Sequence, residues 1–187
     1  MQPNVIPRMT EEEYLAFDRA ADYKSEFVGG EMFAMSGGSL RHSAIAARTI
    51  SELLNKLGAG GCQVFTSDTK IRTAKSRAYL YPDASVVCGE VKRDHEDTLL
   101  NPIVIVEVLS PSTADYDHGK KFAMYREIPS LKDYLLLHTD TILVEHYSKD
   151  ADGSWRLKEY EGIEAEFTLP SVGYTISMKS IYEGAIT

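Results

Sequence analysis

The chain has 187 residues, of which 43% are hydrophobic and 26% are charged. This composition is typical of a folded domain of ordinary size, and no run approaches the roughly 18 apolar residues that a membrane helix needs. The net charge of −8 argues against a protein that coats nucleic acid nonspecifically, because phosphate binding depends on a positive field, although a local basic cleft remains compatible with it. We therefore expect one domain over residues 1–187 and no membrane role.

The amino-terminal segment has neither the apolar core of a secretion signal nor the composition of a transit peptide. We expect a cytoplasmic protein in which residues 1–8 form a loose arm. The chain has only two cysteines, Cys62 and Cys88, and they do not form a C-x-x-C pair. We interpret both as small core residues and expect neither a disulfide framework nor a zinc knuckle.

The first third of the chain predicts helix, hairpin and helix in that order. Thr10 and Glu13 have the spacing of a capping box, which predicts a short helix that runs to about Ala21. The segment "SEFVGGEMFAM" predicts a β-hairpin, because its two apolar runs flank a Gly-Gly pair. Apolar residues then recur at helical spacing between Ser39 and Leu57, which predicts a long helix.

The remainder predicts strands around one further helix. "CQVFTS", "TKIRT" and "AYLYPDASVVC" are strand-like, and the acid-rich "GEVKRDHEDTLLN" predicts a loop. A strand over residues 103–109 and a helix that opens with "ADYDHGKKFAMYREI" follow. The tail predicts a meander of "YLLLH", "ILVEHYS", "SWRLKEYE" and "AEFTL", and a closing helical turn. The fold class is thus α/β or α+β, with a mixed sheet flanked by helices and additional antiparallel strands.

Glu107 is out of place in its predicted strand. Period-two alternation puts Ile103, Ile105 and Leu109 on the same face as Glu107, so the carboxylate shares an apolar face. A buried carboxylate costs several kcal/mol unless a metal, a cation or a proton compensates it. Asp83 lies at the start of another predicted strand, and adjacent strands would bring the two acids together.

Two carboxylates form a hard oxygen site that suits Mg²⁺ or Mn²⁺, and the carbonyl of Val108 could add a ligand. Such a site binds phosphates, which indicates phosphodiester hydrolysis. Lys120 and Lys121 lie on the helix that follows the Glu107 strand and could stabilise the developing charge, and we choose Lys121.

Several motifs resemble the Uma-two family of restriction endonucleases, within the PD-(D/E)XK nuclease superfamily. They are Pro82-Asp83, "EVLSPST" and "DHGKKFAMYRE", and upstream "YKSEFVGGEM" and "RHSAIAARTISELL" resemble the family's hairpin and first long helix. The resemblance runs from about Met9 onward and implies a metal-dependent nuclease core with a restriction-endonuclease-like fold. Where the superfamily has lysine two residues after the second acid this chain has Leu109, and the matching lysine is Lys121 on the following helix.

The same resemblance implies that Glu26 is a third acid near the metal and that His42 is a polar residue of the active site. Each has a plainer interpretation, because His42 lies near a helix start, where solvated or capping roles are common, and Glu26 could point outward from its hairpin.

Alternatives remain for the other residues too. Asp83 could cap a turn, and Glu107 could be neutralised by an arginine such as Arg72 or Arg126. Lys121 could merely pair with Asp117 four residues earlier. The basic run "KIRTAKSR" could track a phosphate backbone or be a solvated loop.

The function we predict is a Mg²⁺- or Mn²⁺-dependent endonuclease acting on DNA, with a homodimer as the expected assembly, because a double-strand cut needs two active sites. A nuclease fold that binds without catalysis, and a metal-dependent hydrolase of a small phosphate ester, are the alternatives.

Overall fold

The structure is a computed structural model that describes residues 8–35, 37–110 and 114–185, with the side chain of Ala59 left aside. Most of the predicted loose arm, and the "PST" that ends the Glu107 strand, lie outside the described residues. Within the described part of the chain, no helix combines the length and the apolar character that crossing a membrane requires.

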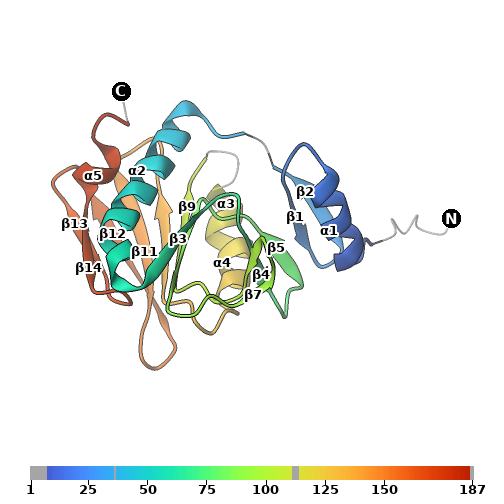
Figure 1. Ribbon diagram of the computed structural model, residues 1–187. Coiled ribbons are helices and arrows are strands. Elements are labelled where there is room, and N and C mark those ends of the chain that lie inside the picture. The colour runs from blue at the N-terminus through green and yellow to red at the C-terminus, as the bar shows by residue number, and fades with distance from the viewer. Residues whose placement is uncertain (1–7, 36, 111–113, 186–187) are drawn as a thin grey trace.

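A mixed six-stranded sheet forms the centre of the molecule, and we call it the central sheet (Figure 1). Two of its neighbouring strands are parallel, and every other neighbouring pair is antiparallel. In spatial order the strands are β12 (Trp155–Glu161), β11 (Leu143–Lys149), β10 (Asp133–Leu137), β9 (Val104–Val108), β6 (Ala84–Cys88) and β3 (Cys62–Thr66). The parallel pair is β9 and β10, as expected when a helix connects two strands.

A second six-stranded sheet includes the amino-terminal hairpin. Its strands in spatial order are β2 (Glu31–Ala34), β1 (Ser25–Val28), β5 (Ala78–Leu80), β4 (Lys70–Thr73), β8 (Thr98–Leu99) and β7 (Arg93–His95). A separate hairpin consists of β13 (Glu166–Leu169) and β14 (Tyr174–Ser177). The blue amino-terminal hairpin and the red carboxy-terminal one lie at opposite ends of the molecule (Figure 1).

Three details of the predicted strands were wrong. The stretch from Ala78 to Cys88 is two strands in different sheets, because the chain turns at Pro82 between β5 and β6. The predicted loop over residues 89–101 contains the short strands β7 and β8, which pair with each other. The strand β14 was not predicted, and its pairing with β13 supplies the partner that β13 requires.

The helices agree with the expected segments. They are α1 (Glu11–Ala20), α2 (Leu40–Leu57), α3 (Ala114–Tyr116), α4 (Phe122–Tyr125) and α5 (Met178–Tyr182), with a 3-10 turn at Gly58–Gly60. The Thr10–Glu13 capping box is present at the start of α1. Between α3 and α4 the chain forms a π-helical segment, Asp117–Lys121, so that residues 114–125 make one helix with a local widening. Such widenings occur frequently at functional sites.

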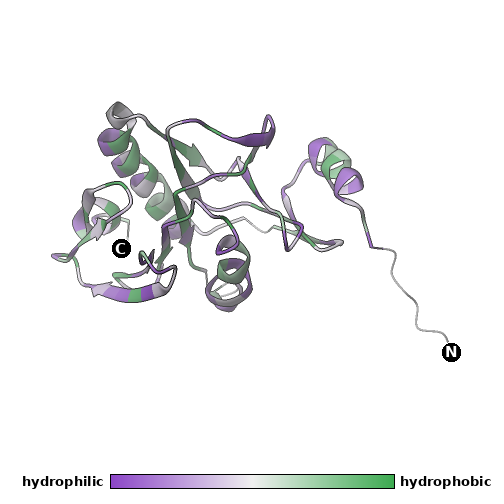
Figure 2. Cartoon of the chain, turned by 90° about the horizontal axis from the view of Figure 1, so that it is seen from below, coloured by the Kyte–Doolittle hydropathy of each residue, from purple (hydrophilic) through white to green (hydrophobic). Residues whose placement is uncertain are grey.

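Both faces of the central sheet are covered. Helices α2 and α5 cover one face together with Val104, Val106 and Val108 of β9. The helix over residues 114–125 covers the other face, where Ile105 and Leu109 point. Figure 2 shows apolar residues gathered on the central strands and polar residues on the outward faces of the helices. The predicted alternation in β9 is therefore confirmed, except that Ile103 precedes the strand and packs on the α2 face.

The interpretation of the cysteines was wrong, because Cys62 and Cys88 form a disulfide. The two residues are directly opposite each other in the antiparallel pair β3 and β6. Their separation of 26 residues in the sequence gave no sign of this pairing, which depends on the register of two strands.

Candidate active site

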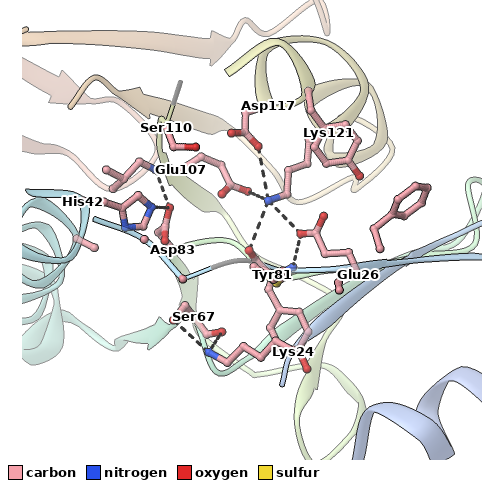
Figure 3. Close-up of a pocket in the computed structure, with 18 of the residues that line it drawn as sticks. Lys24, Glu26, His42, Ser67, Tyr81, Asp83, Glu107, Ser110, Asp117 and Lys121 are labelled. Atoms are coloured by element: carbon pink, nitrogen blue, oxygen red, sulfur yellow. Dashed lines mark hydrogen bonds and ion pairs between the residues drawn. The ribbon is translucent and has the colours of Figure 1, made fainter. Parts of the chain in front are cut away.

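Lys121 lies at the centre of a cluster of acids in a cleft of about 1340 Å³ (Figure 3). Its Nζ is 2.9 Å from Oε1 of Glu107, 3.0 Å from Oε1 of Glu26 and 3.7 Å from Oδ1 of Asp117. It also donates a hydrogen bond of 3.4 Å to the backbone carbonyl of Tyr81. The side chains of Lys121 and Glu107 are only 6% and 4% exposed, so this ion pair is buried.

Three elements bring these groups together. Glu107 comes from the middle of the fully buried strand β9, and Asp117 and Lys121 come from the π-helical segment that covers it. Glu26 lies on β1, and the pairing of β1 with β5 places it beside Tyr81, whose backbone N–H donates to Oε1 of Glu26 at 3.0 Å. The amino-terminal hairpin therefore completes the site.

The electrostatics of Glu107 indicate a site with excess negative charge. Burial raises the pKa of Glu107 well above its ordinary value, and the acids Asp117, Asp83 and Glu26 raise it further, although Lys121 opposes them. Burial also opposes the charge of Lys121, but Glu107, Glu26 and Asp117 outweigh it and raise the pKa of Lys121. The cluster therefore favours any additional cation.

Glu107 is also fixed by Tyr125 of α4. The phenol of Tyr125 donates a hydrogen bond of 3.0 Å to Oε1, the oxygen that meets Lys121. One carboxylate oxygen thus receives both donors, which orients the group toward the cleft.

Asp83 is held by the neighbouring strand and by α2. It immediately precedes β6, and because β6 is antiparallel to β9, the backbone N–H of Val108 donates to Oδ2 of Asp83 at 2.7 Å. Nε2 of His42 lies 3.3 Å from the same oxygen. Hydrogen bonding to Asp83 raises the pKa of His42 against the effect of burial, and the Val108 backbone raises it further. Gly38 leaves room for the imidazole, because a Cβ there would lie 2.7 Å from its Nδ1.

The structure brings the predicted residues into one cleft, which is lined by Glu26, His42, Asp83, Glu107, Val108 and Lys121. They form two adjoining groups. One is centred on Lys121 and the other on the Asp83–His42 pair (Figure 3). Lys120 also lines the cleft but is exposed, whereas Lys121 contacts the acids.

The alternative of an arginine partner for Glu107 is wrong in this structure. Arg72 pairs with Glu11 and Asp94, and Arg126 lies over the ring of Phe122. The cation that meets Glu107 is a lysine from the covering helix.

The other plain interpretations fare differently. The contact of Lys121 with Asp117 is present, but it is the longest of its three carboxylate contacts. In the basic run over residues 70–77, Lys70 is buried between Asp18 and Asp97, and two of its arginines pair with an acid of α1. This run serves the packing of the amino-terminal unit.

Sequence reasoning missed Asp117 and Tyr125 as members of the site. A signal existed, because Asp117, Lys121 and Tyr125 recur at intervals of four residues and therefore lie on one face of the helix. A polar face of this kind on a helix that covers an apolar sheet implies a polar group beneath it, and that group is Glu107.

The architecture and the cleft define a nuclease-like α+β protein. A crystal structure described as that of a putative nuclease belonging to DUF820, from Anabaena variabilis, superimposes with a TM-score of 0.78. The alignment covers 95% of this chain and 99% of that one, and because the identity is 17% the likeness concerns the fold.

The family follows from sequence comparison. The model of the Uma2 family, described as "Putative restriction endonuclease", matches residues 11–179. Two proteins of Synechocystis sp. are also similar. Slr1290 is 36% identical over 179 residues, which cover 96% of this chain and 94% of that protein. Sll1609 is 38% identical over 160 residues, which cover 84% of this chain and 90% of that one. The chain belongs to the Uma2 family, and this membership together with the fold supports a nuclease function in general.

Proposed function

We propose that the protein is a metal-dependent endonuclease that hydrolyses phosphodiester bonds of DNA in the cleft around Lys121. The observation that carries the proposal is the buried contact between Lys121 and Glu107, with Asp83 held beside it on the neighbouring strand. An acid on each of two adjacent strands and a lysine that meets the second acid are the parts that the Uma-two resemblance implies.

The charges in the cleft fit a divalent cation. Four carboxylates, those of Glu26, Asp83, Glu107 and Asp117, surround the single ammonium of Lys121 in the described part of the cleft. The raised pKa of Glu107, caused by burial and by the other acids, expresses the same excess of negative charge. Mg²⁺ or Mn²⁺ suits oxygen ligands and would relieve it.

Asp83 and Glu107 would hold the ion, with the carbonyl of Val108 as a further oxygen ligand. Within the described residues, no three His, Cys, Asp or Glu ligand atoms of this cleft lie within 4.8 Å of one another. The ion would therefore rely on two carboxylates and backbone oxygen. When bound, it polarises a phosphoryl oxygen and makes water a stronger nucleophile near neutral pH.

The chain's own residues have separate roles in the proposal. Lys121 stabilises the negative charge that develops on the phosphate, because its ammonium is buried and already oriented by Glu107 and Glu26. Tyr125 and Glu26 are positioning residues that act through Glu107 and Lys121. His42 positions Asp83 through their contact of 3.3 Å.

The size of the cleft favours a polymer over a small ester. Its volume of about 1340 Å³ exceeds the ~300–1,000 Å³ of pockets that enclose small ligands. Lys24 and Lys120 line it and offer positive charge to a phosphate backbone, although Lys24 also pairs with Asp68. A homodimer, which would place two such clefts on one duplex, remains part of the proposal.

The test is cleavage of supercoiled, linear and single-stranded DNA by the purified protein with Mg²⁺ or Mn²⁺. We expect Glu107→Gln and Asp83→Asn to remain folded and to lose about 100-fold or more of the activity, as when one electrostatic group of an active site is removed. Glu159→Gln makes the same chemical change on the exposed face of strand β12 and should cleave as the wild type does.

Three results would contradict the proposal. Undiminished cleavage by Glu107→Gln would remove the acid from the chemistry. Activity on bis(p-nitrophenyl) phosphate with none on any DNA would indicate a hydrolase of small esters. Binding of DNA without cleavage under every metal condition would indicate a binding module.

A further inference from the structure

A second cluster of metal-ligating side chains lies outside the acid cluster and consists of His118, His138 and Glu145. His118 belongs to the π-helical segment, His138 follows β10, and Glu145 lies on β11. Nε2 of His118 is 2.7 Å and Nε2 of His138 is 2.8 Å from the same oxygen, Oε1 of Glu145. One ligand atom from each residue lies within 4.8 Å of the others. Three separate elements thus aim two imidazole nitrogens and one carboxylate oxygen at one point.

The far sides of the imidazoles have the partners that metal-binding histidines commonly have. Nδ1 of His118 lies 2.7 Å from the carbonyl oxygen of Ala114. A carbonyl only accepts, so Nδ1 carries the proton and Nε2 of the neutral ring directs a lone pair toward Glu145. Nδ1 of His138 faces the carboxylate of Asp140 at 3.8 Å. A lone pair against a carboxylate oxygen is unfavourable unless a cation stands between them.

The cluster is accessible to an ion from solution. The side chains of His118, His138 and Glu145 are 33%, 21% and 11% exposed. The other oxygen of Glu145 accepts a hydrogen bond of 3.4 Å from Tyr147, which fixes the carboxylate on its strand. The ligands are therefore preorganised on secondary structure and still open on one side.

We propose that His118, His138 and Glu145 bind a transition-metal ion of the zinc class. Two imidazoles and one carboxylate are a known ligand set of zinc sites that keep a further position open. Imidazole is a poor ligand for Mg²⁺, so this site differs in chemistry from the oxygen site proposed for Asp83 and Glu107.

The location suggests what the ion does. It joins the helix that carries Lys121 to strands β10 and β11, because His118 belongs to the first and the other two ligands to the second. Asp117 and Thr139, the neighbours of the two histidines, line the cleft. The ion would therefore fasten one wall of the cleft to the central sheet. This inference does not depend on nuclease activity.

The experiment is a titration of the metal-free full-length protein with Co²⁺, followed by visible absorption, and then by competition with Zn²⁺. We expect one ion to bind with the intense absorption of a site of low coordination number. His138→Gln and Glu145→Gln should each weaken binding by more than about 100-fold, beyond the loss expected for an outer partner. Circular dichroism confirms that each variant is folded.

Two controls separate this site from the others. His95→Gln removes a histidine on β7 and should bind Co²⁺ as the wild type does. Glu107→Gln should also keep the Co²⁺ signal while losing Mn²⁺ binding, so that failure of the proposed nuclease site and failure of this site give different results.

Two outcomes would overturn the inference. Wild-type affinity in folded His138→Gln would place the ion elsewhere. Absence of Co²⁺ and Zn²⁺ binding by the folded wild type would mean that the three residues form a histidine–carboxylate ion-pair network only.

Discussion

The ammonium of Lys121 holds three buried or nearly buried acids together, and Lys121→Met removes that charge at similar side-chain volume. Removing one partner of a buried ion pair typically costs about 3–5 kcal/mol. Because Glu107, Glu26 and Asp117 all lie within 3.7 Å of Nζ, we expect the upper end, about 5 kcal/mol near neutral pH. The assay is urea unfolding in EDTA, so that no metal replaces the lost cation.

The loss should depend on pH. The pKa of Glu107 is already raised by burial and by the other acids, and removal of Lys121 raises it further. An acid with a raised pKa in the folded state contributes stability that is present below its unfolded pKa and lost as the pH rises through the folded value. The destabilisation by Lys121→Met should therefore be smaller at about pH 5 than at about pH 8.

Two matched variants test the reasoning. Lys120→Met changes the exposed neighbour and should cost less than about 0.5 kcal/mol. Adding Glu107→Gln to Lys121→Met should recover about 1–3 kcal/mol, because the uncompensated acid is gone. If Lys121→Met and Lys120→Met have the same free energy of unfolding, Lys121 is not the cation that compensates the acids.

Two further predictions concern the walls of the cleft and the central sheet. Gly38→Ala should displace His42, lower its pKa toward the ordinary value and reduce nuclease activity about tenfold, whereas Gly37→Ala, which meets nothing within 4 Å, should not. NMR titration of the imidazole and DNA cleavage measure both, and an unchanged His42 signal in Gly38→Ala would refute the steric argument. Reduction of the Cys62–Cys88 disulfide should lower the free energy of unfolding by about 3 kcal/mol, because it closes a loop of 26 residues. Urea unfolding with and without dithiothreitol measures this, and identical midpoints would contradict it; the double Cys62→Ala/Cys88→Ala variant should not respond to reductant.

Local pattern carried much of the fold. The alternation in β9 identified Glu107 as a buried acid, and the helical spacing between Ser39 and Leu57 identified α2 with nearly the observed bounds. The capping box at Thr10 and the Gly-Gly pair of the first hairpin placed two more boundaries. These predictions succeeded because hydrophobic period, capping and turn chemistry act over a few neighbouring residues.

Short or irregular elements were harder to predict. The strands β7 and β8 have only three and two residues, and their sequence is dominated by charged residues. They exist because β8 pairs with β4 from another part of the chain, and a period of two cannot be recognised over so few positions.

What the sequence by itself determined is that an acid lies buried in a central strand and that a lysine follows it on the next helix. Only the tertiary structure decided that Lys121, and not an arginine, meets Glu107, that Glu26 joins them from a distant hairpin, and that Cys62 faces Cys88. Each of these contacts joins residues far apart in the chain. The reason is that the partner of a buried charge or of a cysteine is set by strand register and by the packing of helix on sheet, and neither of these is encoded within a few neighbouring residues.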